Sequence, residues 1–118
     1  MFFRAYARLS AAALLLALSG PAHAEPLTID LPHHVVTAHG AEVHLTPTEF
    51  DLLKELALAE GRPLTHQMLL RTVWGPAYTR DTQLLRTHMG RLRDRMESAG
   101  VPRGTIETLT GVGYRLRS

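Results

Sequence analysis

Cysteine is absent from this chain of 118 residues. Its absence excludes both a disulfide framework and a metal site built on thiolates, but it is compatible with any cellular compartment. Internal repeats and low-complexity tracts are absent as well. Once the first 24 residues are set aside, the remainder is long enough for one small domain with a single economical core.

The sequence also lacks the patterns that catalysis requires. Its serines stand in no nucleophile context, and it shows neither paired carboxylates nor a phosphate-cradling loop. We therefore expect no enzyme activity and no cofactor. Four neighbouring histidines offer a rival chemistry, a metal site, but their spacing matches no defined site. Ordinary surface histidines are expected at His33, His34, His39 and His44.

Lysine occurs once, and the positive charge that is present is unevenly distributed. Residues 25–61 carry one base, Lys54, and seven acids, whereas residues 62–118 carry ten arginines and four acids. Such asymmetry indicates that one end presents a cationic face to an anionic partner. Guanidinium groups suit bidentate contacts with phosphates and base edges. A codon bias would explain the ratio of arginine to lysine, but not the clustering.

The first 24 residues follow the pattern of a secretory signal peptide. Arg4 and Arg8 precede an apolar run at 9–18, and Ala22-His23-Ala24 has the form of a cleavage site. The apolar run is too short to span a bilayer comfortably. We expect a separable segment at 1–24 before a domain at 25–118. The alternative is a mis-assigned start, or a fusion of unrelated sequence onto the domain.

The domain begins with the pattern of a small antiparallel meander, with strands expected at 27–31, 35–37 and 42–45. A helix then starts at a capping box, in which Thr46 is the N-cap and Glu49 the third helical residue. Its apolar stripe ends at Gly61. The expected stripe contains Phe50, Leu52, Leu53, Leu56 and Ala57.

Two more helices and a hairpin complete the pattern. The second helix is capped by Thr65 and ends at Gly75-Pro76, and its apolar residues are Met68, Leu69, Val73 and Trp74. The third helix is expected from Thr79 to Ser98, with a narrow buried stripe of Leu85, Met89, Leu92 and Met96. Strands at 105–109 and 112–116 meet at Thr110-Gly111.

This order predicts an α+β fold, a winged helix-turn-helix with an N-terminal antiparallel sheet, three helices and a C-terminal β-hairpin wing. On a helical wheel the face of the third helix opposite its buried stripe holds Gln83, Thr87, Gly90, Arg91 and Asp94. Arg91 is then placed to contact a guanine in a major groove, and Gly90 lets the helix approach closely. The flanking positions hold Arg86, Arg93, His88, Leu84 and Arg95.

The alternative is that this helix has an ordinary solvated face, with ion pairs along the helix such as Arg93 with Glu97. The hairpin favours the nucleic-acid interpretation, because threonines lie beside its glycine-rich tip and arginines lie on its return strand. Such a wing can enter a minor groove or lie along phosphates. The alternative is a plain hairpin that closes the sheet, with Tyr114 and Leu116 in the core.

Four stretches occur in order: "VHLTPTEFDLL", "GRPLTHQMLLRTVWG", "LLRTHMGRLRDRME" and "TLTGVGYRL". Together they resemble the OmpR/PhoB-type winged-helix domain of bacterial response regulators over residues 27–117. Within that family they are most similar to the regulators of the Kdp potassium-transport operon. The resemblance implies a four-stranded N-terminal sheet whose short fourth strand precedes the second helix, a recognition helix at 79–98 and a wing at 108–113.

The resemblance also implies partners and roles. The partners are double-stranded DNA at promoter direct repeats, RNA polymerase at the loop Gly75–Thr79, and a second copy of the chain on the DNA. Arg91 is expected to read bases, while the positions of His88, Arg93 and Thr108 bind phosphates and Trp74 approaches the backbone. The expected DNA-binding set is Trp74, Arg86, Thr87, His88, Arg91, Arg93, Thr108, Thr110 and Arg115.

Three features depart from the family pattern. Thr110 stands where some members place a minor-groove arginine, and Gly90 stands where others have an arginine. Signal-like residues also stand where members carry a phosphorylated receiver domain, so we expect dimerisation to depend on tandem half-sites or on another partner.

The expected function is sequence-specific DNA binding in transcription regulation, as the output domain of a two-component response regulator in the cytoplasm, with no membrane in the mature domain. The alternatives are an exported interaction module and a remnant of a regulator.

Overall fold

The computed structural model describes residues 27–117. The segment predicted at 1–24 therefore lies outside the described residues. The elements are β1 (Thr28–Asp30), β2 (Val35–Ala38), β3 (Ala41–Val43), α1 (Pro47–Leu58), β4 (Leu64–Thr65), α2 (His66–Val73), the 3-10 turn η2 (Pro76–Tyr78), α3 (Thr82–Ser98), the 3-10 turn η3 (Arg103–Thr105), β5 (Ile106–Leu109) and β6 (Gly113–Leu116). The α+β winged helix-turn-helix that the sequence predicts is confirmed.

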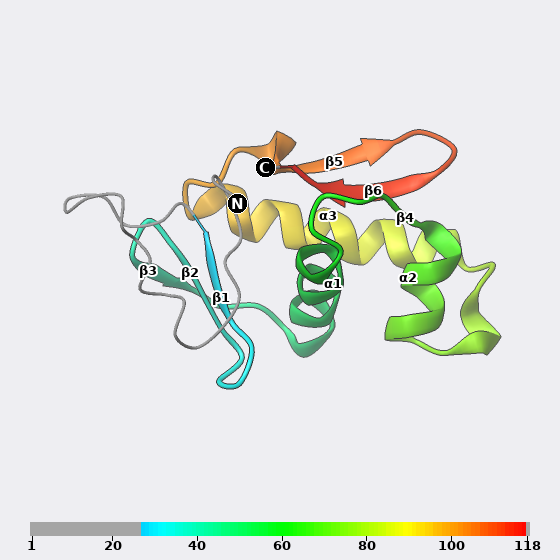
Figure 1. Cartoon of the computed structure of the whole chain (residues 1–118), viewed down its shortest axis with the longest axis horizontal. Helices are drawn as coiled ribbons and strands as arrows, with labels where there is room; N and C mark the ends of the chain where they lie inside the picture. The colour runs from blue at the N-terminus through cyan, green and yellow to red at the C-terminus, as the bar shows by residue number, and fades with distance from the viewer. Residues whose placement is uncertain (1–26, 118) are drawn as a thin grey trace.

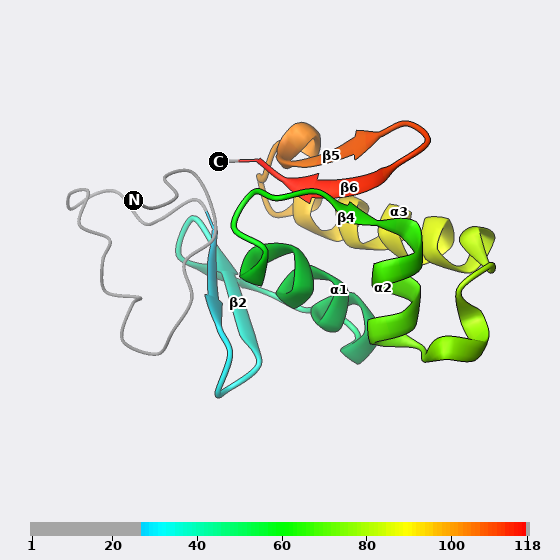
Figure 2. The ribbon, with the colours of Figure 1, turned by 45° about the vertical axis from the view of Figure 1, so that its right-hand side comes forward.

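The N-terminal sheet lies at one end of the domain and α2 at the other, while α3 runs between them beneath the C-terminal hairpin (Figure 1). Helix α1 packs across the middle of α3. Figure 2 shows the same arrangement from a second side, with β4 lying alongside β6. One face of α3 is thereby covered by the rest of the domain, and its other face is left to the solvent.

The predicted meander is confirmed, with strand ends that differ by one or two residues. Its strands pair antiparallel in the order β1-β2-β3, and Val36 lies opposite Val43. Side chains alternate across the sheet, so Ile29 and Val36 are buried while their strand neighbours are half-buried. Strand β3 stops at Val43, two residues earlier than expected.

Helix α1 starts at the predicted capping box. The backbone N–H of Glu49 donates to the Oγ1 of Thr46 (3.2 Å), and the backbone N–H of Thr46 donates to the Oε1 of Glu49 (3.0 Å). The expected stripe is buried throughout. The helix ends at Leu58, earlier than the Gly61 stop, and Gly61 lies in the chain reversal that follows with a φ of 86°.

Helix α2 begins at Thr65 as predicted, since the Oγ1 of Thr65 accepts from the backbone N–H of Met68 (3.0 Å). Leu69 and Leu70 are buried. Met68, one of the apolar residues that the sequence places on this helix, is not part of the buried face, because its side chain is 49% exposed. Leu69, Leu70 and Val73 share one face of the short helix, and Met68 is turned out of it.

Helix α3 begins at Thr82, three residues later than predicted. The residues before it form η2 and a turn, and the side chain of Asp81 caps the helix by accepting from the backbone N–H of Leu84 (3.2 Å). The cap is therefore an aspartate, and Thr79 lies outside the helix. The predicted buried stripe of Leu85, Met89, Leu92 and Met96 is confirmed.

A fourth short strand precedes α2, as the resemblance implies, but it does not join the N-terminal sheet. Within residues 27–117 that sheet has three strands, and β4 pairs with β6 of the hairpin. The close approach depends on Gly113, because a Cβ there would lie 1.9 Å from the carbonyl oxygen of Leu64. The hairpin turn runs from Thr110 to Val112 and is closed by a 2.8 Å hydrogen bond from the Val112 N–H to the Leu109 oxygen.

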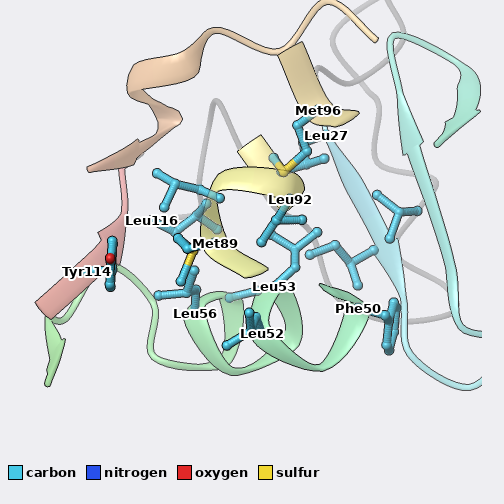
Figure 3. Packing of buried hydrophobic residues seen from close by; sticks show 14 of the residues in the cluster. Leu27, Phe50, Leu52, Leu53, Leu56, Met89, Leu92, Met96, Tyr114 and Leu116 are labelled. Atoms are coloured by element: carbon cyan, nitrogen blue, oxygen red, sulfur yellow. The ribbon is translucent and has the colours of Figure 1, made fainter. Parts of the chain in front are cut away.

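The core lies where α1, α3 and the hairpin meet (Figure 3). Leu53 and Leu56 of α1 face Leu92 of α3, and Leu116 of β6 is buried beside them. Each fully buried leucine contributes about 1.5–3 kcal/mol relative to an exposed one. Tyr114 and Leu116 serve this core as expected. In residues 27–117 no helix has the length and apolar character needed to span a membrane.

Candidate nucleic-acid interface

The solvent-facing side of α3 carries a row of exposed residues. Gln83, Thr87 and Arg91 follow one another at intervals of four residues, and all three are exposed. Their side chains form no hydrogen bond or ion pair within residues 27–117. The opposite stripe of α3 is buried in the core, and the helix packs against α1, α2 and η3.

Ion pairs divide the arginines into two groups. Arg95, Arg103 and Arg115 each lie within 3 Å of a carboxylate oxygen, at 2.7, 2.8 and 2.8 Å. By contrast, in the described part of the chain no carboxylate lies within ion-pair distance of five exposed arginines: Arg62, Arg71, Arg80, Arg86 and Arg91. Arg80 lies just before α3, and Arg86 and Arg91 lie on it. Three of these five unpaired charges therefore lie on the first two-thirds of α3 or directly before it.

The C-terminal end of α3 carries two carboxylates whose charge a single arginine partly offsets. Arg103 in η3 donates from its Nη1 to the carboxylate of Asp94 (2.8 Å) and to that of Glu97 (2.9 Å). The hydrogen bond to Asp94 and then that to Glu97 raise the pKa of the Arg103 guanidinium. Because this end of α3 gains no net positive charge, an anionic partner would favour the other half of the helix.

Arg93 fastens α3 to the hairpin. Its Nη2 and Nε donate to the carbonyl oxygen of Ile106 at 2.7 and 3.2 Å, and its Nη2 also donates to the Oγ1 of Thr108. The guanidinium lies 5.5 Å from the centre of the Tyr114 ring. The alternative pairing of Arg93 with Glu97 was wrong, because Arg103 holds Glu97.

Burial lowers the pKa of Arg93 from its ordinary value. The ordinary value of a guanidinium is so high that the group remains cationic at neutral pH. Its Nη1 makes no hydrogen bond within residues 27–117. Arg93 thus holds the wing with one edge of its guanidinium and leaves two N–H groups free on the other.

His88 and Trp74 form a contact between α3 and the residue that caps the end of α2. Their rings meet edge to face with centroids 5.2 Å apart, and both residues are half-buried. The Nδ1 of His88 lies 3.0 Å from the carbonyl oxygen of Leu84. Because a carbonyl only accepts, Nδ1 carries the proton in this contact, and the Nε2 of a neutral ring is an acceptor.

The wing presents polar groups without strong net charge. Thr108 and Thr110 are exposed, and the Oγ1 of Thr108 accepts from Arg93. Arg115 is half-buried, and its Nε lies 2.8 Å from the carboxylate of Glu107. The charge of Arg115 is therefore largely offset within the hairpin. Val112 at the turn is exposed and apolar.

The loop Gly75–Thr79 forms η2 and exposes Tyr78, whose side chain is 44% accessible. The four histidines of the N-terminal region make separate contacts with Asp30, Phe50, Gly100 and Glu42. Within residues 27–117 no group of three or more metal-ligating side chains comes together.

The structure brings most of the predicted DNA-binding residues to one side of α3 and the adjoining wing. Trp74, Arg86, Thr87, His88 and Arg91 lie on α3 or against it, and Arg93 joins them to Thr108. Sequence reasoning left out the unpaired cations Arg71 and Arg80 and the exposed Gln83. The signal for Gln83 was its place on the helical wheel, but no local signal distinguishes a paired from an unpaired arginine.

Known proteins share this domain. Residues 40–116 match the family described as "Transcriptional regulatory protein, C terminal". The chain is 39% identical over 94 residues to the transcriptional regulatory protein KdpE of Mycobacterium tuberculosis, covering 80% of this chain and 42% of KdpE. It is 41% identical over 87 residues to the response regulator MtrA of Mycolicibacterium smegmatis, covering 74% of this chain and 38% of MtrA.

A solved structure has a similar fold. The RstA DNA-binding domain of Klebsiella pneumoniae aligns with a TM-score of 0.70 and 28% identity, over 78% of this chain and 91% of that one. The chain thus spans about two-fifths of the length of the curated relatives KdpE and MtrA, and the predicted resemblance to OmpR/PhoB-type effector domains is confirmed. The chain belongs to the family formed by the C-terminal domain of transcriptional regulatory proteins.

Proposed function

We propose that this domain binds double-stranded DNA sequence-specifically and regulates transcription as the output domain of a two-component response regulator. The observation that carries the proposal is the row of exposed, unpaired residues on α3, flanked by arginines that no carboxylate within residues 27–117 neutralises. A helix of this width fits the major groove with such a face on the base edges.

Similar proteins that bind DNA support the proposal. RstA was solved in complex with its RstA box, and MtrA is named a DNA-binding response regulator. KdpE, which is 39% identical to this chain over 94 residues, is named a transcriptional regulatory protein. The shared family makes a regulator of transcription the function most consistent with the geometry. A family of DNA-binding domains is not a family of enzymes, and we propose no catalytic role.

The proposed roles follow the position of each side chain. Arg91 contacts a base edge, with guanine preferred because a guanidinium can donate to both O6 and N7. Thr87 lies beside it on the same face, and Arg86 contacts a flanking phosphate. Trp74 and His88 approach the sugar-phosphate backbone as an edge-to-face pair.

The wing contributes from its exposed side. Arg93 and Thr108 act together, since the Nη1 of Arg93 and the hydroxyl hydrogen of Thr108 are both free to donate to one phosphate. Thr110 lies at the turn and is proposed to contact the minor groove without charge. Arg115 contributes less than the sequence suggested, because Glu107 offsets its charge.

Assembly on DNA and contact with the polymerase are further parts of the proposal. One domain offers a single recognition helix, so we propose that two copies bind promoter direct repeats as a homodimer on the DNA. The exposed Tyr78 in the loop Gly75–Thr79 is the proposed contact with RNA polymerase. Both are tested by the stoichiometry on two half-sites and by transcription with Tyr78→Ala.

We propose the cytoplasm as the working compartment, because a promoter lies there. The signal-like pattern at residues 1–24 favours one alternative, an exported module that keeps the winged-helix fold without DNA regulation. Fractionation with mass spectrometry of the N-terminus separates the two. A mature chain that starts at Glu25 outside the cytoplasm would support export, and an uncleaved cytoplasmic chain would contradict it.

The decisive experiment is binding of the full chain to duplexes selected from a random pool, at several salt concentrations. Arg86→Ala is expected to reduce the dependence of log affinity on log salt by about 0.9, as one lost phosphate contact should. Arg91→Ala is expected to relax the preference at one base pair, at a cost of about 1–3 kcal/mol. Glu55→Ala on α1 serves as the control. Selection of no preferred sequence would overturn the proposal.

A further inference from the structure

Gly90 lies in the middle of α3, and nothing inside the described part of the domain requires a glycine there. A Cβ built at this position would have no heavy atom within 4 Å outside its own turn of the helix. Its backbone is ordinary helix, without the positive φ of Gly75, Gly100 or Gly111. Neither close packing nor backbone conformation therefore explains the residue.

Gly113 shows what an internal requirement looks like in the same chain. There a Cβ would lie 1.9 Å from the Leu64 carbonyl oxygen, so the domain itself excludes a side chain. In the interior of a helix, glycine is less favourable than every ordinary residue except proline, because it loses the most backbone entropy. At position 90 this cost is not compensated by any contact within residues 27–117.

The surroundings of Gly90 indicate the charge of what approaches it. Arg86 and Thr87 lie one turn earlier on the same side of α3, and Arg91 is adjacent; all three are exposed. Arg93 lies three residues later, with its Nη1 free of hydrogen bonds within the described chain. The one acid nearby is Asp94, four residues later, and Arg103 pairs with its carboxylate at 2.8 Å. The gap left by the missing side chain is therefore bordered mainly by cations, which is the pattern that attracts a polyanion.

We propose that Gly90 is the point of closest approach between α3 and double-stranded DNA, where the nucleic acid occupies the volume that a side chain would fill. The inference rests on the proposed function, because it takes DNA as the partner of this face. It assigns to the glycine a positioning role: the bare backbone lets α3 lie deep enough for Arg91 and Thr87 to reach the base edges.

The proposal predicts that stability and binding change in opposite directions. Gly90→Ala in the full chain is expected to raise Tm by about 4–8 °C, because alanine favours the helix and meets no obstacle. The same variant is expected to bind the duplex selected by the wild-type chain about tenfold more weakly or worse. Gly90→Leu, also a good helix former, is expected to lose more affinity than Gly90→Ala.

Gly104→Ala is the matched control. Gly104 lies in η3, which contacts the C-terminal end of α3 and not the half that carries Thr87 and Arg91, and a Cβ there also meets nothing within 4 Å. Its affinity for the duplex should equal that of the wild type. Thermal unfolding and fluorescence anisotropy on the same preparations give both readouts.

Each other outcome has a distinct meaning. If the Gly90→Ala variant is more stable than the wild type and binds DNA equally well, the inference is overturned and the proposed function stands. A lowered Tm would also overturn it, since the glycine would then serve the fold. A wild-type chain that selects no duplex above the random pool would remove both proposals together.

Discussion

Arg93 of α3 donates two hydrogen bonds to the carbonyl oxygen of Ile106, at 2.7 Å from Nη2 and 3.2 Å from Nε. The side chain thereby ties the recognition helix to the first strand of the wing. A residue that the charge pattern marks as a phosphate ligand is thus also a structural contact. Its two roles can be separated, because one edge of the guanidinium serves the hairpin and the other faces outward.

Arg93→Ala is expected to destabilise the domain by about 1–3 kcal/mol, because the partly buried Ile106 carbonyl loses its donor. Hydrogen exchange should quicken in β5 and β6 before it quickens in α1. Urea unfolding of Arg86→Ala provides the comparison, since Arg86 is exposed on the same helix. Equal stability of the two variants would contradict a fastening role for Arg93.

Glu49 joins α1 to α3 from a fully buried position. It is 1% exposed, and its Oε1 accepts from the Nε of Arg95 (2.7 Å) and from the backbone N–H of Thr46 (3.0 Å). Glu49→Ala removes the ion pair and half of the capping box, and we expect a loss of about 3 kcal/mol in the free energy of unfolding.

Glu49→Gln separates the two contributions, because an amide oxygen can still accept from Thr46 while the charge opposite Arg95 is lost. Its destabilisation should lie between that of Glu49→Ala and zero. Glu55→Ala, on the same helix and without an ion pair in residues 27–117, is expected to change stability by less than about 0.5 kcal/mol. Chemical denaturation that ranks Glu55→Ala with Glu49→Ala would refute this assignment.

Gly113 is expected to be among the least replaceable residues of the hairpin. Gly113→Ala places a Cβ 1.9 Å from the Leu64 carbonyl oxygen, so β4 and β6 must separate. We expect a loss of at least about 2 kcal/mol and a fall in Tm. Gly104→Ala adds the same atom in open space and should leave Tm nearly unchanged. Similar melting curves for both variants would show that β4 does not depend on this approach.

Local features of the chain were sufficient to predict the order and type of its elements. The capping box at Thr46 and Glu49, and the Leu85-to-Met96 stripe, act within one helix, so they can be read without knowing the partner. The start of α3 was predicted three residues too early, because Pro76–Tyr78 form a 3-10 turn and the side chain of Asp81 caps the helix after it.

In the candidate site, too, some features follow from the local sequence and others follow only from the tertiary structure. Periodicity alone places Arg91 and Thr87 on the outward face of α3, opposite its buried stripe. Whether an arginine is free or paired depends on residues far away in the chain: Glu49 holds Arg95, Ile106 holds Arg93, and Glu107 holds Arg115. The first contact forms when α1 packs against α3, the second when the hairpin closes over α3, and the third when β5 pairs with β6.

The sheet partner of β4 and the open space around Gly90 were likewise decided by tertiary packing. The two residues of β4, Leu64 and Thr65, are too few to show from their pattern which of the two sheets the strand joins. The close approach of β4 to β6 at Gly113 accompanies its pairing with the hairpin. Capping and helical periodicity are short-range, so the order of residues is enough to establish them. Strand pairing, ion pairing and solvent exposure depend on residues that are distant in the sequence, so only the folded chain establishes them.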